Sequence, residues 1–383
     1  MITHVGLFEG YGGTSMAAAR ALGPLNTLWV SDIKPASITL LRHRHPDVPN
    51  LGNLKLIHWP RTVRAYGRPD LVTASWPCQP HSSAGKRLGE ADPRALWPNV
   101  VDAIAALRPR IFLGENVARI TSNGELRRVV RSLADLGYVG AWRVQRASDV
   151  YAPHRRERCF VVAVDPAAYA HAGGQRPHIA HTSAGEPDAS GGGQLTLLPT
   201  PAARDGKGVM PRGPRADGYA RSIAQLDLPG AIQLLPTPTA RLGDSSVRGA
   251  DAARYRGPRS MNGRRSNLDD CVAAVDERAP WMADRLPGGS YWGVYSEAIA
   301  RWGCAFDREA PAPTQLGTKG QPQLSPGFVE WMMGLPQGHV TGVPGLTRNQ
   351  QLSLLGDGVV PQQGAAAFSF LLGHLAQRLA VAA

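Results

Sequence analysis

The sequence predicts an α/β protein in which a parallel sheet carries helices on both faces and a second, loop-rich domain interrupts the chain. Three observations lead to this prediction. Strand-like apolar runs alternate with helical patterns over residues 1–165, the alternation is lost over 166–320, and helical patterns return over 321–383. Such alternation is typical of a parallel sheet. The irregular stretch is too long to be one loop, so we expect it to be a separate domain.

Nine segments of the first region carry the prediction. The expected strands are Thr3–Phe8, Thr27–Ser31, Asp70–Ala74, Arg110–Gly114 and Arg158–Val164. The expected helices are Thr14–Leu22, Pro35–Arg44, Ala95–Leu107 and Leu126–Leu136. In the last region, helices are expected at Pro326–Met333 and Ala365–Leu379, separated at 356–361 by a turn and a short extended piece. Ligands of such sheets bind beyond the carboxyl ends of the strands.

Composition sets broad limits on the function. The 383 residues include 42 Lys and Arg against 30 Asp and Glu, a formal charge of +12, which permits a polyanionic partner. The content of 43% hydrophobic and 19% charged residues describes a soluble globular protein. No apolar run reaches the roughly 18 residues of a membrane span, and no secretion leader is visible. We therefore expect a cytoplasmic protein, and a monomer.

The cysteines indicate a reducing compartment. Cys78, Cys159, Cys271 and Cys304 lie far apart and form no CxxC pair. This pattern argues against a disulfide scaffold and against structural zinc. We expect no metal site.

A glycine-rich loop, Phe8-Glu9-Gly10-Tyr11-Gly12-Gly13, joins the first expected strand to the first expected helix. Glycines at this place let a ligand approach the backbone beside a helix N-terminus. Asp32 closes the second strand, where an acidic side chain can accept hydrogen bonds from ribose hydroxyls. The spacing is not GxGxxG, so a tight strand-to-helix turn remains the alternative to a nucleotide-type cofactor site.

A cysteine loop, Ser75-Trp76-Pro77-Cys78-Gln79-Pro80-His81-Ser82, follows the third expected strand. Two prolines bracket Cys78 at the carboxyl end of the strand, where its thiol would meet a bound ligand. Its thiolate would be a nucleophile in a positive or hydrogen-bonding environment. A small buried hydrophobic residue is an equally good interpretation of a lone cysteine.

Three further features carry charge. Glu115 follows the fourth expected strand, where burial can raise the pKa of a carboxyl and make it a proton donor; an ordinary helix N-terminal carboxylate is the alternative. The run 151–158 is rich in Arg and could bind a phosphate or orient a carboxylate. The Arg-rich stretch 241–265 suits phosphate contacts. Solvated surface charge is the alternative for both runs.

Together, five motifs in order resemble the DNA cytosine-5 methyltransferase family, in particular its bacterial and phage members. Gly6–Gly13 resembles the family's Asp-Leu-Phe-x-Gly-x-Gly-Gly loop, Pro77–Ser82 its Pro-Cys-Gln-Pro-Phe-Ser loop, and 115–117 its Glu-Asn-Val. Residues 153–158 resemble Pro-Gln-Arg-Arg-Glu-Arg, and 356–361 resemble Gly-Asn-x-Val-x-Pro. The resemblance implies a Rossmann-like, S-adenosylmethionine-dependent methyltransferase fold. It covers residues 3–164 and 324–372, and 166–320 takes the place of the family's target recognition domain.

The resemblance also implies roles for individual residues. Cys78 would attack C6 of a cytosine flipped out of duplex DNA, and protonated Glu115 would act at N3. Arg156 would orient the base or help hold the thiolate, and Arg158 would support Glu115 or the same loop. The S-adenosylmethionine site would comprise Phe8, Gly10, Gly12, Gly13, Asp32, Ile33 and Asn53. Gln79 and Ser82 would contact the substrate.

Four positions depart from the family pattern, namely Gly6 for Asp, Asn53 for an acidic residue, His81 for Phe, and Asp357 for Asn. Three alternatives stay open. They are an RNA cytosine-5 methyltransferase of the same fold, a catalytically silent DNA-binding relative, and a folate-dependent pyrimidine methylase. The last would need neither the glycine loop nor a nucleic-acid domain.

Overall fold

The computed structural model describes residues 1–77, 96–167, 197–198, 200–203, 292, 295–317 and 322–382. Six strands form the main sheet, in the order β2-β1-β3-β4-β6-β5. Their bounds are β1 Ile2–Leu7, β2 Leu25–Ser31, β3 Leu71–Ala74, β4 Ile111–Val117, β5 Val139–Gln145 and β6 Arg158–Val164. All five expected strands are therefore present, with β5 in addition.

The sheet is only partly parallel, which corrects the prediction of a parallel sheet. Strands β2, β1, β3 and β4 run parallel, but β6 is antiparallel to β4, and β5 is antiparallel to β6. Within the segment that joins β5 to β6, the helical structure is one 3-10 turn, Ala147–Val150. A parallel connection usually crosses over through a helix, and because this segment contains no crossover helix, β6 returns antiparallel to β5.

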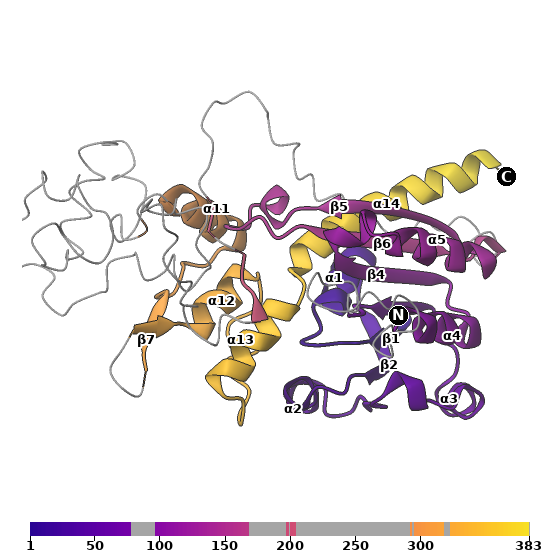
Figure 1. Ribbon diagram of the computed structural model, residues 1–383, viewed down its shortest axis with the longest axis horizontal. Coiled ribbons are helices and arrows are strands. Elements are labelled where there is room, and N and C mark those ends of the chain that lie inside the picture. The colour runs from indigo at the N-terminus through magenta and orange to yellow at the C-terminus, as the bar shows by residue number, and fades with distance from the viewer. Residues whose placement is uncertain are drawn as a thin grey trace, which may run out of the picture.

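Helices cover both faces of the sheet (Figure 1). One face packs against α1 (Gly13–Leu22) and α14 (Pro361–Ala382) through a core that includes Phe160 and Phe368. The other face packs against α3 (Trp59–Tyr66), α4 (Trp97–Leu107) and α5 (Glu125–Asp135). The fold is thus a mixed α/β fold with helices on both faces of one sheet.

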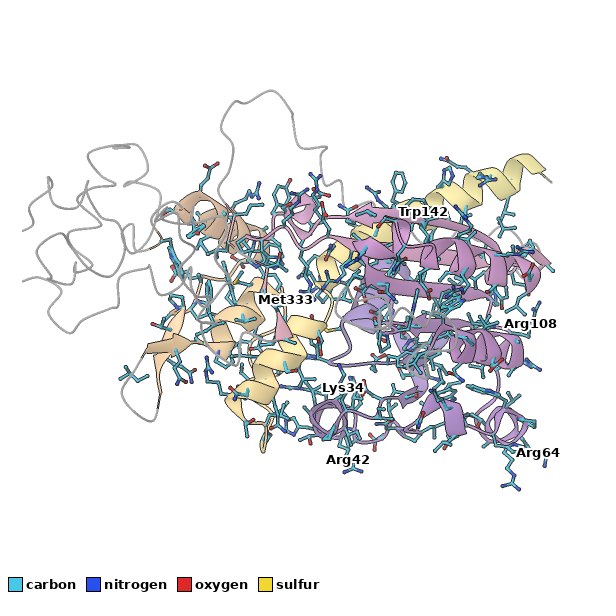
Figure 2. The ribbon with its side chains drawn as sticks, viewed as in Figure 1. Lys34, Arg42, Arg64, Arg108, Trp142 and Met333 are labelled. Carbon is cyan, nitrogen blue, oxygen red and sulfur yellow. The ribbon has the colours of Figure 1, made fainter. Side chains whose placement is uncertain are left out.

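A second core lies beside the sheet and packs α2 (Pro35–Arg44), α11 (Ser296–Phe306), β8 (Pro322–Leu324), α12 (Pro326–Met332) and α13 (Arg348–Asp357). Strand β7 (Thr314–Leu316) pairs with β8. The 3-10 turns at Leu54–Leu56 and Ala118–Thr121 instead pack into the core of the sheet. Trp302 of α11 donates its indole N–H to the carbonyl of Trp331, 2.9 Å away, and both rings are buried. Figure 2 shows Met333, also buried, where this group of helices meets the rest of the molecule, and the exposed Trp142 on edge strand β5.

One expectation about the last region needs correction. The segment 356–361 is not a turn followed by an extended piece throughout, because α13 continues to Asp357 and α14 begins at Pro361. Only 358–360 are non-helical. Thr347 begins α13 with a capping box, in which its hydroxyl and Gln350 satisfy each other's backbone N–H groups. Proline at the first position of α14 fits its fixed φ and missing N–H.

Candidate active site

The glycine-rich loop takes left-handed backbone conformations where β1 passes into α1. Gly10 has φ of 59° and Gly12 has φ of 88°, angles that glycine adopts without the steric cost of a Cβ. Phe8 also has a positive φ, 55°, which is uncommon for a residue with a side chain. The loop therefore turns sharply and leaves its backbone open to the neighbouring cavity.

The C-terminal part of the chain braces this loop from behind. The hydroxyl of Tyr11 donates to the carbonyl of Val359 at 2.6 Å, and Nε2 of His339 donates to the carbonyl of Tyr11 at 2.7 Å. A Cβ on Gly13 would lie 2.7 Å from the Val359 carbonyl oxygen, and a Cβ on Gly358 would lie 1.8 Å from the Tyr11 ring. Glycines at both places permit the close approach of two segments that are more than 300 residues apart.

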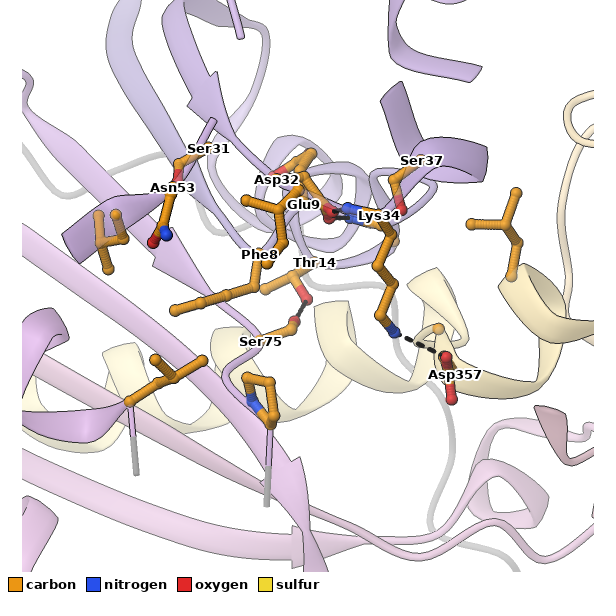
Figure 3. A pocket seen from close by; sticks show the side chains of 18 of the residues that line it. Phe8, Glu9, Thr14, Ser31, Asp32, Lys34, Ser37, Asn53, Ser75 and Asp357 are labelled. Carbon is orange, nitrogen blue, oxygen red and sulfur yellow. Dashed lines mark hydrogen bonds and ion pairs between the residues drawn. The ribbon is translucent and has the colours of Figure 1, made fainter. Parts of the chain in front are cut away.

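A cavity of about 430 Å³ opens between the loop, the end of β2, residues 52–55 and residues 354–359 (Figure 3). Asp32 lines it, with one carboxylate oxygen 2.8 Å from the Gly10 N–H and the other 2.8 Å from the Lys34 N–H. Ile33 also lines the cavity and is 61% exposed, so it offers an apolar surface to a ligand. Asn53 lines the cavity while its Oδ1 accepts from the Lys55 N–H at 3.1 Å.

A buried acid lies on the neighbouring strand β4. Oε1 of Glu115 is 3.0 Å from Nε of Arg158 on β6, and the two side chains are 7% and 15% exposed. Burial raises the pKa of Glu115, and the guanidinium groups of Arg158 and Arg156 oppose this change without cancelling it. The site therefore favours a protonated carboxyl more than water does.

Hydroxyl groups connect this acid to the cavity. Ser75, which follows β3, hydrogen-bonds with Glu115. The Ser75 hydroxyl also lies 2.5 Å from the hydroxyl of Thr14 on α1, and both residues line the cavity. The arrangement thus joins a ligand cavity to a proton donor at the carboxyl ends of adjacent strands, as expected for such a sheet.

Comparison with known protein families identifies the family that this part of the chain resembles. Residues 2–185 match the model of the family described as C-5 cytosine-specific DNA methylase. This region of the chain belongs to the C-5 cytosine-specific DNA methylase family. The family match contains the glycine loop, Asp32, Glu115 and Arg158, and so covers the residues of the site described above.

Two curated relatives are type II methyltransferases. M.NlaIV of Neisseria lactamica is 29% identical over 175 residues, which are 42% of this chain and 40% of the relative. M.HaeII of Haemophilus aegyptius is 41% identical over 97 residues, 24% of this chain and 30% of the relative. The chain therefore spans less than half the length of either relative.

The likeness to solved structures extends further along the chain. The crystal structure of the S. pombe Dnmt2 methyltransferase is 14% identical, covers 98% of this chain and 99% of its own, and gives a TM-score of 0.52. At this identity the likeness shows the fold alone.

The methylase cysteine loop lies mostly outside the described residues, which exclude 78–95. Cys78, Gln79 and Ser82 belong to that stretch. The described residues on either side of it, Pro77 and Leu96, both line the cavity. Trp76 is buried, and its carbonyl accepts a 2.9 Å hydrogen bond from the Asn116 side chain, which fixes where the loop leaves β3.

Arg156 is not among the residues that line the cavity, and its guanidinium contacts backbone carbonyls of other segments. Its guanidinium donates to the carbonyls of Pro201 at 2.9 Å, Gly356 at 3.0 Å and Gly358. Burial, helped by the charge of Arg158, lowers the pKa of Arg156 to about 9. In this methylase fold the arginine joins β6 to the segment 356–358 that supports the glycine loop.

The structure adds cavity residues that the motifs did not single out. Glu9, within the glycine loop, lines the cavity, and so does the ion pair of Lys34 Nζ and Asp357 Oδ2, 2.8 Å apart. The motif resemblance had marked Asp357 only as a departure, and nothing in the sequence around Lys34 pointed to this pairing. Among the described residues, no cluster of His, Cys, Asp or Glu could hold a metal ion, and no helix there is long and apolar enough to cross a membrane.

Proposed function

We propose that this chain transfers a methyl group from S-adenosylmethionine to C5 of a cytosine within a specific duplex DNA sequence. The observation that carries the proposal is Glu115. It is a buried carboxyl of raised pKa, held by Arg158, and Ser75 and Thr14 connect it to a ligand cavity beside the strand that leads into Pro77-Cys78. Family membership over residues 2–185 supports the same activity.

The groups that line the cavity suit S-adenosylmethionine. Ile33 presents an exposed apolar side chain to a ring, and Asp32 can accept hydrogen bonds from ribose hydroxyls. Phe8, Gly10, Gly12, Gly13 and Asn53 would complete the site. When bound, S-adenosylmethionine would supply the methyl group that C5 receives.

The residues of this chain would make C5 reactive. The thiolate of Cys78 adds to C6, and Glu115 donates its proton toward N3, so that electron density moves onto C5. After C5 has gained the methyl group, it loses its proton, and Cys78 leaves C6 to restore the aromatic ring. Arg158 orients Glu115 through the 3.0 Å contact, while Arg156 acts at a distance by holding segment 356–358.

Recognition of DNA would involve the rest of the chain. A cysteine thiolate cannot reach C6 inside a duplex, so the target base must leave the stack. We propose that 166–320 forms the target recognition domain, between a catalytic domain at 1–165 and a returning segment at 321–383. Its Arg-rich stretch, 241–265, would contact phosphates, and binding would therefore weaken with salt.

Methyl transfer with tritiated S-adenosylmethionine tests the proposal directly. Duplex DNA should accept label at cytosine, and bisulfite sequencing of DNA from expressing cells should locate the product. Cys78→Ala should abolish transfer and leave cofactor binding near normal, and a 5-fluorocytosine target should trap a covalent complex. Transfer to tRNA but not to DNA would favour the RNA enzyme instead, and full transfer by Cys78→Ala would refute the nucleophile.

A further inference from the structure

The carboxylate of Glu9 occupies the space beside Gly6 on strand β1. A Cβ built on Gly6 would lie 2.0 Å from Oε2 of Glu9, and one built on Gly12 would lie 3.4 Å from Oε1. The carboxylate therefore lies between the strand and the glycine loop, while Glu9 also lines the cavity. Gly6 is the position at which the resembling family loop begins with Asp.

This carboxylate lies in the cavity without a positive partner. Asp32 lines the same cavity and carries a second carboxylate. The nearby Lys34 uses its ammonium on Asp357. Within the described part of the chain, no ion pair reaches Glu9 or Asp32, and His4 is kept neutral because burial lowers its pKa to about 3. Lys55 also lines the cavity. Two carboxylates that form no ion pair of their own suit a cationic ligand.

The proton equilibrium of Glu9 agrees with such a site. Burial, and then the charge of Asp32, raise the pKa of Glu9 to about 7, although a hydrogen bond from the Ser15 hydroxyl opposes the change. A cation placed beside this carboxylate would favour its ionised form. The free protein thus holds a carboxylate that gains stability from an ammonium group.

We propose that Glu9 binds the α-ammonium group of the amino-acid moiety of S-adenosylmethionine. The Glu9 carboxylate, three residues further along the chain, takes the space that a side chain at position 6 would occupy. The inference rests on the proposed function, because it takes S-adenosylmethionine as the ligand of this cavity. Asp32 and Ile33 would hold the adenosine end, and Glu9 would hold the charged end.

Calorimetric binding of three probes tests the assignment. S-adenosylmethionine and S-adenosylhomocysteine both carry the ammonium, and 5′-methylthioadenosine lacks it. Glu9→Gln should weaken the first two by roughly tenfold or more, as the loss of a charged hydrogen bond requires, and leave the third unchanged. Glu297→Gln, the same change at an exposed position on α11, should alter none of them. Equal loss for all three probes, or loss for S-adenosylmethionine alone, would overturn the assignment.

A double variant tests whether the two positions share one space. Gly6 has no positive φ, so its backbone accepts a side chain. Gly6→Asp alone should displace the Glu9 carboxylate and weaken binding, and so should Glu9→Ala alone. Combined, they should recover most of the affinity, because one carboxylate again fills the space. A double variant that folds, by its melting curve, and binds no better than Glu9→Ala refutes the shared space.

The pH dependence of binding gives a readout that a structural role would not produce. With a pKa of about 7, Glu9 makes S-adenosylmethionine bind roughly eightfold more weakly at pH 6.0 than at pH 7.5. His4 on β1 stays neutral over this range, and the other charged groups facing the cavity are Asp32, Lys55 and the Lys34–Asp357 pair. Glu9→Gln should lose the dependence, and a variant that keeps it refutes Glu9 as its source.

The calorimetric experiment distinguishes failure of the proposed function from failure of the role proposed for Glu9. If the wild-type chain binds none of the three probes, the proposed function fails. If it binds S-adenosylmethionine and Glu9→Gln binds it equally well, the proposed function stands and only the role of Glu9 is refuted.

Discussion

Replacing Arg158 with Met should make the stability of the protein strongly dependent on pH. In the wild type, the guanidinium lies 3.0 Å from the Glu115 carboxylate, and both side chains are largely buried. Removing one partner of a buried pair costs about 3–5 kcal/mol of unfolding free energy when the other stays charged. Glu115 can avoid that cost by keeping a proton, which is easy at low pH and costs about 1.4 kcal/mol per pH unit above its pKa.

The direction of the pH effect follows from the pKa of Glu115. Its pKa in the folded protein is raised above the unfolded value, so the folded state binds more protons between the two values. Stability therefore falls as pH rises through that interval. Arg158→Met raises the folded pKa further and extends the interval upward. The variant should lose little stability at about pH 5, and the loss should grow by at most about 1.4 kcal/mol per pH unit toward a limit near 3–5 kcal/mol.

Urea unfolding of four proteins measures this effect. The wild type, Arg158→Met, Glu115→Gln and the double variant are compared at acidic, neutral and mildly alkaline pH. Differences between the curves remove the contributions of other titrating groups. In the Glu115→Gln background, the Arg158 substitution should cost the same at every pH. If the difference in unfolding free energy between the wild type and Arg158→Met does not change with pH, the coupling of Arg158 to a buried, titrating Glu115 is refuted.

Three further variants test how the cavity is built. Gly13→Ala should lower the unfolding free energy by about 1–3 kcal/mol, since its Cβ meets the Val359 carbonyl at 2.7 Å, and an unchanged urea midpoint would contradict that contact. Tyr11→Phe removes the 2.6 Å hydrogen bond to Val359 and should cost about 1 kcal/mol by the same assay, so a more stable variant would argue against the brace. Lys34→Met breaks the exposed pair with Asp357 and should change stability by less than about 1 kcal/mol, an effect that about 1 M salt should remove. A larger, salt-independent loss would mean that Lys34 acts through packing.

The strands and helices around the cavity could be predicted because their signals are local. The expected strand Thr3–Phe8 appears as Ile2–Leu7, and Pro35–Arg44 forms a helix with the expected bounds. Strand β5 gave a weaker signal, since Trp142 faces solvent and Arg143, on the opposite face, covers the Phe370 ring at 4.2 Å. This reverses the usual apolar-in, polar-out alternation.

Helix α13 was missed although a local signal existed. Its sequence, RNQQLSLLGD, has little hydrophobic periodicity, so periodicity alone does not predict a helix there. The Thr347-x-x-Gln350 capping box, which precedes an apolar stretch, is a recognised sign of a helix start. Weighing caps as well as periodicity would have placed this helix.

The role of Arg156 illustrates what a motif leaves open. The motif placed two arginines near each other, but only the fold separates them, with Arg158 on the buried acid and Arg156 on three carbonyls from residues 201, 356 and 358. Strand alternation does not separate them, because residues two apart share a face of a sheet. Arg156 precedes β6 and has a positive φ of 29°, and the segments that meet there decide which groups each arginine contacts, so no local pattern contains that information.

The sequence by itself determined the five expected strands and the helices predicted beside them, and it singled out residues at the strand ends: the glycine loop, Asp32 and Glu115. These depend on hydrophobic periodicity and on residue types within a few positions. Only the tertiary structure decided that β6 runs antiparallel, that Val359 braces the glycine loop, and that Glu9 fills the space beside Gly6. These contacts depend on close packing between distant segments, where the presence or absence of a single Cβ decides which side chain can occupy a space.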